Sequence, residues 1–203
     1  MSAFRKDTPE RRPITTQVNH YSEHRNDLKI DFKNRCGYCN GIDTWRLMSF
    51  EIDHFIPQNK NKKPFLTIKT NTDYSNLVYA CKSCNNSKSN KWPTNNENIS
   101  HQNDEGFIDP CDKEYEKQFD RLSQGEIVAV TKLGSWIYNE LKLYKPQHQI
   151  IWSIEQLDIL IDEINALLAT ITNENITIQL KDRLLKVHEK YRHYTKQLGN
   201  LNR

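Results

Sequence analysis

Apolar residues recur at helical spacing most clearly toward the C-terminal end of the chain. Two series of apolar residues are separated by steps of three or four positions: Leu157, Ile161, Ile164, Leu168 and Ile171, then Leu180, Leu184, Val187, Tyr191, Tyr194 and Leu198. Ser153 and Gln156 form a capping box ahead of the first series, and the stretch TNEN at 172–175 can turn the chain between the two. The pattern predicts an antiparallel helical hairpin over residues 151–203, either folded back on its own domain or offering a partner-binding or dimerising surface.

The remaining apolar positions predict shorter elements. In YSEHRNDLKIDFKN (21–34), Leu28 and Phe32 share one face of a helix that Ser22 can cap. The stretch WRLMSFEIDHFIP (45–57) alternates as expected for a hairpin of two short strands that ends at Pro57. NLVYACKSCNNSKSNKW predicts an apolar segment and then a helix that ends before Pro93, and further helices are predicted at 112–122 and 131–143.

These elements divide the 203 residues into five predicted segments. They are an irregular and mobile basic arm (1–20), a core (21–93), a linker rich in asparagine and acidic residues (94–112), a helical extension packed on the core (113–150) and the hairpin (151–203). No run of about 18 apolar residues occurs, which excludes a membrane span. The basic start MSAFRKDTPERRP lacks the apolar core of a secretory signal, so we expect a bacterial cytoplasmic protein.

Positive charge is concentrated in one segment. The net charge of +3 sums 29 basic and 26 acidic residues and by itself argues for no particular partner. Between Gln58 and Lys91, however, the sequence contains seven lysines and one acidic residue, Asp73. Such a local field suits a polyanion, whereas the alternative is a solvated lysine-rich loop.

Four of the five cysteines form two C-x-x-C pairs. These pairs are Cys36 with Cys39 in CGYC, and Cys81 with Cys84 in CKSC. An odd count without an export signal argues against a disulfide framework, while two such pairs supply four thiolates to one structural Zn²⁺. Cys111 has no partner at useful spacing, and its role stays open.

The two cysteine pairs bracket residues that carry chemistry. They are Glu51, Asp53 and His54 in E-x-D-H, Asn76 in N-L-V, and Asn85 and Lys88 in C-x-x-C-N-x-x-K. Over residues 34–92 this arrangement resembles the HNH endonucleases of the His-Me finger, or ββα-metal, superfamily. The last histidine of the family pattern is Asn85 here, which retains an oxygen ligand, and a lysine-rich loop replaces the glycine-rich stretch often seen after D-H-x-x-P.

The chemistry of phosphodiester hydrolysis explains these residue types. His54 can be neutral near pH 7 and take a proton from water, so we assign it as the general base. Asp53 and Asn85 offer hard oxygen ligands for a catalytic Mg²⁺ or Mn²⁺. The resemblance implies that Asn76 braces the loop and helps to fix the imidazole of His54. Lys88 is expected to contact a substrate phosphate, and the role of Glu51 stays open.

The resemblance implies a fold and a function. We expect an α+β protein with a ββα-metal HNH core stapled by the four-cysteine zinc site, surrounded by helices and followed by the helical hairpin. We expect a metal-dependent endonuclease that acts on DNA in preference to RNA. The stretch from Lys113 to Trp152 is also similar to the tail of small stand-alone bacterial HNH proteins of restriction and phage-defence loci, some of which, as in Septu-type systems, act beside an ATPase subunit. This second likeness implies a role in bacterial phage defence or restriction. The further lysines expected to bind nucleic acid are Lys60, Lys62, Lys63, Lys82 and Lys91.

Two alternatives remain at this point. One is a nuclease subunit that stays silent until a partner ATPase complex activates it, with the C-terminal helices binding that partner or forming a homodimer. The other is a zinc module that binds nucleic acid or a protein without catalysis. The second alternative explains the cysteines and lysines but leaves the placement of Asp53, His54 and Asn85 without a reason.

Overall fold

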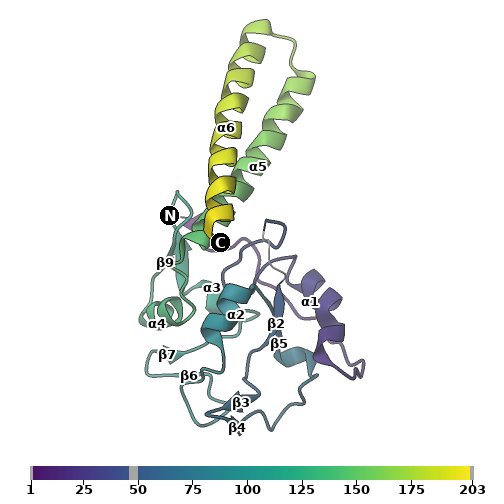
Figure 1. Cartoon of the computed structure of the whole chain (residues 1–203), viewed down its shortest axis with the longest axis vertical. Coiled ribbons are helices and arrows are strands. Elements are labelled where there is room, and N and C mark those ends of the chain that lie inside the picture. The colour runs from purple at the N-terminus through teal and green to yellow at the C-terminus, as the bar shows by residue number, and fades with distance from the viewer. Residues whose placement is uncertain (1, 46–49, 202–203) are drawn as a thin grey trace. The chain divides into compact units, whose positions relative to one another are not determined.

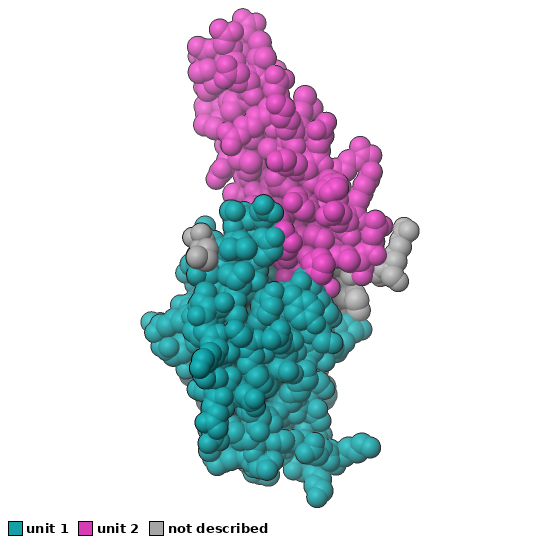
Figure 2. Space-filling view, turned by 90° about the vertical axis from the view of Figure 1, so that its left-hand side faces the viewer, with its two compact units in different colours: residues 1–145 teal, residues 146–203 magenta. Residues whose placement is uncertain are grey.

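The computed structural model describes residues 2–45 and 50–201. It has mixed α+β structure, as predicted, and divides into two compact units, residues 1–145 and 146–203 (Figure 2). The first unit contains the predicted arm, core and linker and the extension up to residue 145, whereas residues 146–150 of the predicted extension belong to the second unit.

Two strands and a helix form the centre of the first unit (Figure 1). Strand β2 (Glu51–His54) pairs antiparallel with β5 (Leu77–Ala80), and helix α2 (Lys82–Lys88) follows directly after Cys81. All four residues of β5 are buried, because the strand is covered on both faces. The predicted partner of β2, a strand before residue 50, falls largely on 46–49 and lies outside the described residues.

The helical segment before the first cysteine pair is shorter than predicted. It consists of a 3₁₀ turn, η1 (Tyr21–His24), followed by α1 (Arg25–Asp31). The N-cap is His20, whose side chain accepts from the Ser22 backbone N–H, so the predicted cap at Ser22 is wrong by two positions. Leu28 and Phe32 are both buried, which confirms the predicted apolar face.

The N-terminal segment is packed on the core and is not a free arm. Strand β1 (Ser2–Ala3) pairs antiparallel with β8 (Phe119–Arg121). Arg5 pairs with Glu116 at 3.0 Å, and Arg11 binds both carboxylate oxygens of Asp109 at 3.0 and 2.9 Å. Although its backbone is mostly irregular, its arginines therefore tie this segment to distant parts of the first unit.

Residues 94–145 contain short strands that the helical spacing did not predict. The predicted linker holds a hairpin of β6 (His101–Gln102) and β7 (Glu105–Gly106). The predicted helix at 112–122 is wrong beyond α3 (Lys113–Glu116), because β8 then pairs with β9 (Ile127–Ala129) across a turn in which Gly125 has φ +96°. Helix α4 (Lys132–Glu140) lies within the predicted range 131–143.

Three further short elements lie between β2 and β5. Strands β3 (Asn59–Lys60) and β4 (Lys63–Pro64) form a hairpin within the lysine-rich loop. A 3₁₀ turn, η2 (Tyr74–Asn76), then leads directly into β5. Its N-cap is Asp73, the acidic residue of the cationic segment, whose side chain accepts from the Ser75 backbone N–H.

The second unit is the predicted helical hairpin. Helix α5 (Pro146–Thr170) and helix α6 (Glu174–Leu201) pack along each other, with Ile164, Val187 and Leu198 buried. The first helix begins before the predicted Ser153 cap, which lies inside it, whereas Asn173 Oδ1 accepts from the Ile176 N–H at the start of the second. Within the described residues, no helix has both the length and the apolar character needed to cross a membrane.

Candidate active site

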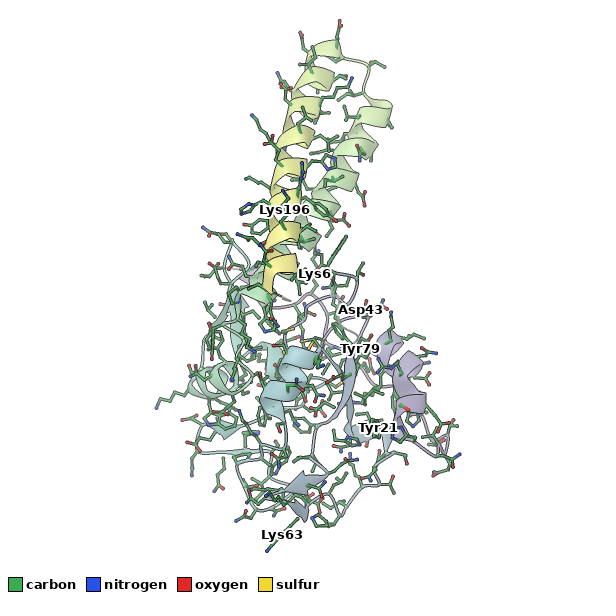
Figure 3. The ribbon with its side chains drawn as sticks, in the orientation of Figure 1. Lys6, Tyr21, Asp43, Lys63, Tyr79 and Lys196 are labelled. Atoms are coloured by element: carbon green, nitrogen blue, oxygen red, sulfur yellow. The ribbon has the colours of Figure 1, made fainter. Side chains whose placement is uncertain are left out.

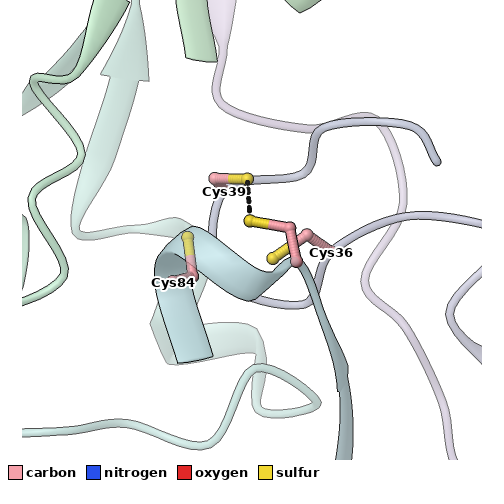
Figure 4. Close-up of side chains that lie close together, drawn as sticks. Cys36, Cys39 and Cys84 are labelled. Atoms are coloured by element: carbon pink, nitrogen blue, oxygen red, sulfur yellow. Dashed lines mark hydrogen bonds between the residues drawn. The ribbon is translucent and has the colours of Figure 1, made fainter. Parts of the chain in front are cut away.

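The four cysteines of the two C-x-x-C pairs meet in the first unit (Figure 4). Their sulfur atoms all lie within 4.8 Å of one another, and all four residues are buried. The Cys39 and Cys81 Sγ atoms are 3.9 Å apart, which matches the separation of about 3.8 Å that tetrahedral Zn–S bonds impose. Among residues 2–45 and 50–201, these four cysteines are the one group of histidine, cysteine or carboxylate side chains that lie close enough together to hold a metal ion.

The electrostatics of the cluster suit a cation. Burial raises the pKa of Cys36 well above its ordinary value, and the neighbouring Cys36 thiol does the same for the pKa of Cys84. Because zinc binds thiolates, a bound ion supplies the positive charge that this apolar setting otherwise lacks. Cys111 lies outside the cluster, and burial raises its pKa to about 12.

The first C-x-x-C pair, residues 36–39, forms a tight turn, here called the knuckle, that lies against β5. The Gly37 N–H donates to the Tyr79 carbonyl at 2.9 Å. A Cβ atom at Gly37 would approach side-chain carbons of Phe32 at 2.7 Å and Val78 at 2.9 Å, so only glycine fits at this position without a shift. The cysteine cluster is therefore fixed to the strand that pairs with Asp53 and His54.

His54 is the last residue of β2, and its imidazole has a defined tautomer. Its Nε2 lies 2.8 Å from the Asn71 carbonyl, which can only accept, so Nε2 carries a proton, and in the neutral imidazole Nδ1 keeps its lone pair. The Gln58 amide nitrogen is 3.4 Å from the same Nε2, too long to change this assignment. Burial lowers the pKa of His54 below its ordinary value, although the Asn71 carbonyl and Asp53 act in the opposite direction.

Asn76 holds the backbone that follows His54. Its Oδ1 accepts from the Ile56 N–H at 2.9 Å, its Nδ2 donates to the Ile56 carbonyl at 3.1 Å, and its own carbonyl accepts from the Phe55 N–H at 2.8 Å. The side chain thus binds backbone two residues beyond the histidine instead of the imidazole itself. The imidazole packs edge-on against Tyr21, with ring centroids 4.8 Å apart.

Asp53 is buried between two donors. The Tyr38 hydroxyl donates to Asp53 Oδ2 at 2.5 Å, and the Lys88 ammonium lies 3.1 Å from the same oxygen and 3.4 Å from Oδ1. Lys88 also donates to the His54 carbonyl at 2.9 Å, and its side chain is 0% exposed. The predicted contact of Lys88 with a substrate phosphate does not fit this placement, because an ammonium buried between two acceptors cannot reach a phosphate in solvent.

Glu51 lies on the same face of β2 as Asp53 and pairs with Asn85 of α2. Residues two apart on a strand share a face, and residues three apart share one side of a helix. Glu51 and Asp53 accordingly lie opposite Asn85 and Lys88 of α2. Asn85 donates its Nδ2 to Glu51 Oε2 at 2.7 Å, so its Oδ1 is the atom that can accept a metal ion.

The other candidate lysines divide into two kinds. Lys62, Lys63 and Lys82 are exposed, and the first two lie at the β3–β4 hairpin. Figure 3 labels Lys63 there. Lys60 donates to the Thr94 carbonyl, and Lys91 pairs with Glu140 at 2.6 Å. The exposed lysines are the ones available to a polyanion.

Two residues of this site, Tyr38 and Asn71, were not predicted from the sequence. Tyr38 stands inside the first C-x-x-C pair, where spacing draws attention to the cysteines alone. Asn71 contributes its backbone carbonyl, which any residue type could supply. Their roles arise from tertiary contacts and not from a motif.

Comparison with known proteins identifies the domain that these residues build. The family model for the HNH endonuclease matches residues 36–91, a range that contains both cysteine pairs, β2, β5 and α2. No curated protein and no solved structure matches the chain. The chain therefore contains an HNH endonuclease domain at residues 36–91, with a buried four-cysteine cluster inside it.

Proposed function

We propose that the chain is a metal-dependent endonuclease that hydrolyses phosphodiester bonds in DNA. The observation that carries this proposal is His54, whose Nε2–H is committed to the Asn71 carbonyl and whose Nδ1 is left as a base, within an HNH domain. A non-catalytic zinc module gives no reason for this arrangement.

His54 acts as the general base in this proposal. A histidine that is neutral near pH 7 can take the proton of the attacking water, and the lowered pKa of His54 favours the neutral form. The donated Nε2–H fixes the ring orientation. The Asn76 bonds to Ile56 support the backbone on the far side of the histidine, which makes Asn76 a bracing residue.

Asp53 and Asn85 are the proposed ligands of a catalytic Mg²⁺ or Mn²⁺. Their donor set fits a hard cation: within the described part of the chain Asp53 Oδ1 has only the 3.4 Å contact with Lys88, and the amide oxygen of Asn85 is a suitable ligand. When bound, such an ion neutralises charge on the phosphoryl oxygens and stabilises the leaving 3′ oxygen. The expected products carry a 5′ phosphate and a 3′ hydroxyl.

The remaining proposed roles are structural and electrostatic. The four-cysteine cluster holds a structural Zn²⁺ that staples the knuckle to α2. The exposed lysines 62, 63 and 82 contact the phosphate backbone, which positions nucleic acid without reading its sequence.

Nicking of supercoiled plasmid by the purified chain tests the proposal. We expect cleavage with Mg²⁺ or Mn²⁺, its loss with EDTA, and a fall of at least about 10²-fold in His54→Ala with zinc content unchanged. His101→Ala is the matched control, since His101 is exposed in β6 and lies outside the site. Full cleavage by His54→Ala overturns the assignment, and a parallel assay on single-stranded RNA decides between the two nucleic acids.

We also propose a role in phage defence or restriction, in which the hairpin joins two copies of the chain. Exposed apolar residues on its helices support a surface of this kind: Ile159, Leu167, Ile176, Ile178 and Leu185. Helix α5 carries acidic residues and no lysine or arginine, whereas α6 is rich in lysine and arginine. In an antiparallel dimer, α5 of one copy can therefore pack against α6 of the other with opposite charges in contact.

Light scattering of the purified chain measures its mass and tests the dimer. A monomer that forms a stable complex with an ATPase subunit on co-purification would replace the dimer with the partner-activated alternative. Plating of phage on cells that express the chain or its His54→Ala variant tests the biological role.

A further inference from the structure

Asp53 has a partner that belongs to the zinc knuckle. Tyr38 stands between Cys36 and Cys39, and its hydroxyl donates to Asp53 Oδ2 at 2.5 Å. The Tyr38 side chain is fully buried. The Asp53 side chain is 7% exposed, so this hydrogen bond is largely shielded from water, and the Tyr38 hydroxyl has no solvent as an alternative partner.

Two hydrogen bonds fix the backbone on which Tyr38 stands. Tyr115 donates its hydroxyl to the Tyr38 carbonyl at 2.7 Å, and the Gly37 N–H donates to β5 at 2.9 Å. The backbone at Tyr38 is therefore anchored from two directions. Because of this anchoring, the hydroxyl defines where the Asp53 carboxylate can lie.

The second partner of Asp53, Lys88, is close in sequence to the other cysteine pair. Lys88 lies one turn after Cys84 on α2 and reaches the same carboxylate at 3.1 Å. Tyr38 and Lys88 thus approach Asp53 from the two cysteine pairs. Two donors on a carboxylate restrict its rotation about the Cβ–Cγ bond, which fixes the direction of its remaining lone pairs.

We propose that Tyr38 is a positioning residue that orients the Asp53 carboxylate, so that the zinc knuckle sets the geometry of the catalytic metal ligand. This inference rests on the proposed function, in which Asp53 binds the catalytic ion. Hydrogen bonds to a ligating carboxylate commonly set its orientation, and their loss weakens metal binding or activity.

Tyr38→Phe is the variant that tests the inference, because it removes the hydroxyl and keeps the ring. Tyr79→Phe is its matched control: Tyr79 is also a buried tyrosine whose hydroxyl donates to a carboxylate, that of Asp43, at 2.9 Å (Figure 3). Both variants lose one tyrosine–aspartate hydrogen bond, but only the first loses it at the proposed metal ligand.

Mn²⁺ binding to the zinc-loaded full chain, measured by calorimetry without nucleic acid, is the primary readout. We expect Tyr38→Phe to bind Mn²⁺ about tenfold more weakly than wild type, with zinc content unchanged and cleavage partly recovered at high Mn²⁺. We expect Tyr79→Phe to bind Mn²⁺ as wild type does. Asp53→Asn supplies the reference for loss of the site.

The outcomes separate this inference from the proposed function. Weakened binding in Asp53→Asn but wild-type binding in Tyr38→Phe, or equal loss in Tyr38→Phe and Tyr79→Phe, overturns the inference and leaves the metal assignment standing. Wild-type binding in Asp53→Asn overturns the metal assignment and the inference together. Cleavage by His54→Ala bears on the general base and leaves the role of Tyr38 unaffected.

Discussion

The Lys88 ammonium and the Asp53 carboxylate form a buried ion pair at 3.1 Å, with the lysine side chain 0% exposed. Removal of one partner leaves the other charge buried without compensation. We expect Lys88→Met to lower the free energy of unfolding by about 3–5 kcal/mol, measured by denaturant titration.

A control for this prediction lies on the same helix. Lys82 is exposed at the start of α2, so Lys82→Met should change the free energy of unfolding by less than about 0.5 kcal/mol. The double variant Asp53→Asn with Lys88→Met should recover part of the loss, because neither charge then remains buried. Equal effects of Lys88→Met and Lys82→Met would contradict the buried pair.

Removal of one cysteine of the four-cysteine cluster, the proposed zinc site, should unfold the HNH domain. Structural zinc binding contributes folding free energy on the order of 10 kcal/mol, so Cys36→Ser or Cys81→Ser should abolish the cooperative thermal transition of this domain. Cys111→Ser is the control, since Cys111 lies outside the cluster. Circular dichroism with and without a strong chelator measures both effects, and a stable Cys81→Ser domain would refute a structural metal.

Asp31 should make the first unit sensitive to acid. Burial raises the pKa of Asp31, but hydrogen bonds from Tyr74 and Arg12 outweigh burial and leave this pKa below its ordinary value. A carboxyl whose pKa is lowered on folding stabilises the protein above its unfolded pKa of about 4, and this stabilisation is lost as the pH falls through the folded value.

The corresponding measurement is the free energy of unfolding as a function of pH. We expect it to decline below about pH 4, and the decline should be shallower in Asp31→Asn, which has no proton to gain. An identical slope in the two proteins would show that other carboxyl groups govern the acid response.

The exposed lysines of the β3–β4 hairpin should govern affinity for nucleic acid. Lys62→Gln with Lys63→Gln should weaken DNA binding and reduce the slope of log K against log salt by about 1 to 2, because each phosphate contact releases about one counterion. Lys113→Gln with Lys117→Gln removes two exposed lysines, one in α3 and one at its C-cap, and should leave binding unchanged. Fluorescence anisotropy over a salt series measures the slopes, and equal slopes for both double variants would refute a specific role for this hairpin.

Local sequence signals predicted the parts of the protein that depend on near neighbours. The three-four spacing from Leu157 to Leu198 identified both hairpin helices, because the apolar face of a helix repeats within a few residues. The spacing of the four cysteines predicted their cluster for a similar reason, since a two-residue gap lets both sulfur atoms of a pair reach one ion.

Residues 112–122 show where the local spacing of apolar residues predicts the wrong element. Tyr115 and Phe119 lie four apart, as on one face of a helix, and both are buried. Phe119 is nevertheless in a strand, because β8 finds partners in β1 and β9, and long-range pairing overrides a weak helical preference.

By itself the sequence determined the hairpin, the cysteine cluster and the D-H pair of the HNH domain. Tertiary structure alone decided that Lys88 is buried, that Tyr38 donates to Asp53 and that the Asn71 carbonyl sets the tautomer of His54. The physical reason is that burial and hydrogen-bond partners depend on which distant segments pack together. From the sequence alone, a lysine one turn after a cysteine of the cluster is interpreted as a surface charge. Only the folded chain shows that a strand from elsewhere places a carboxylate against it.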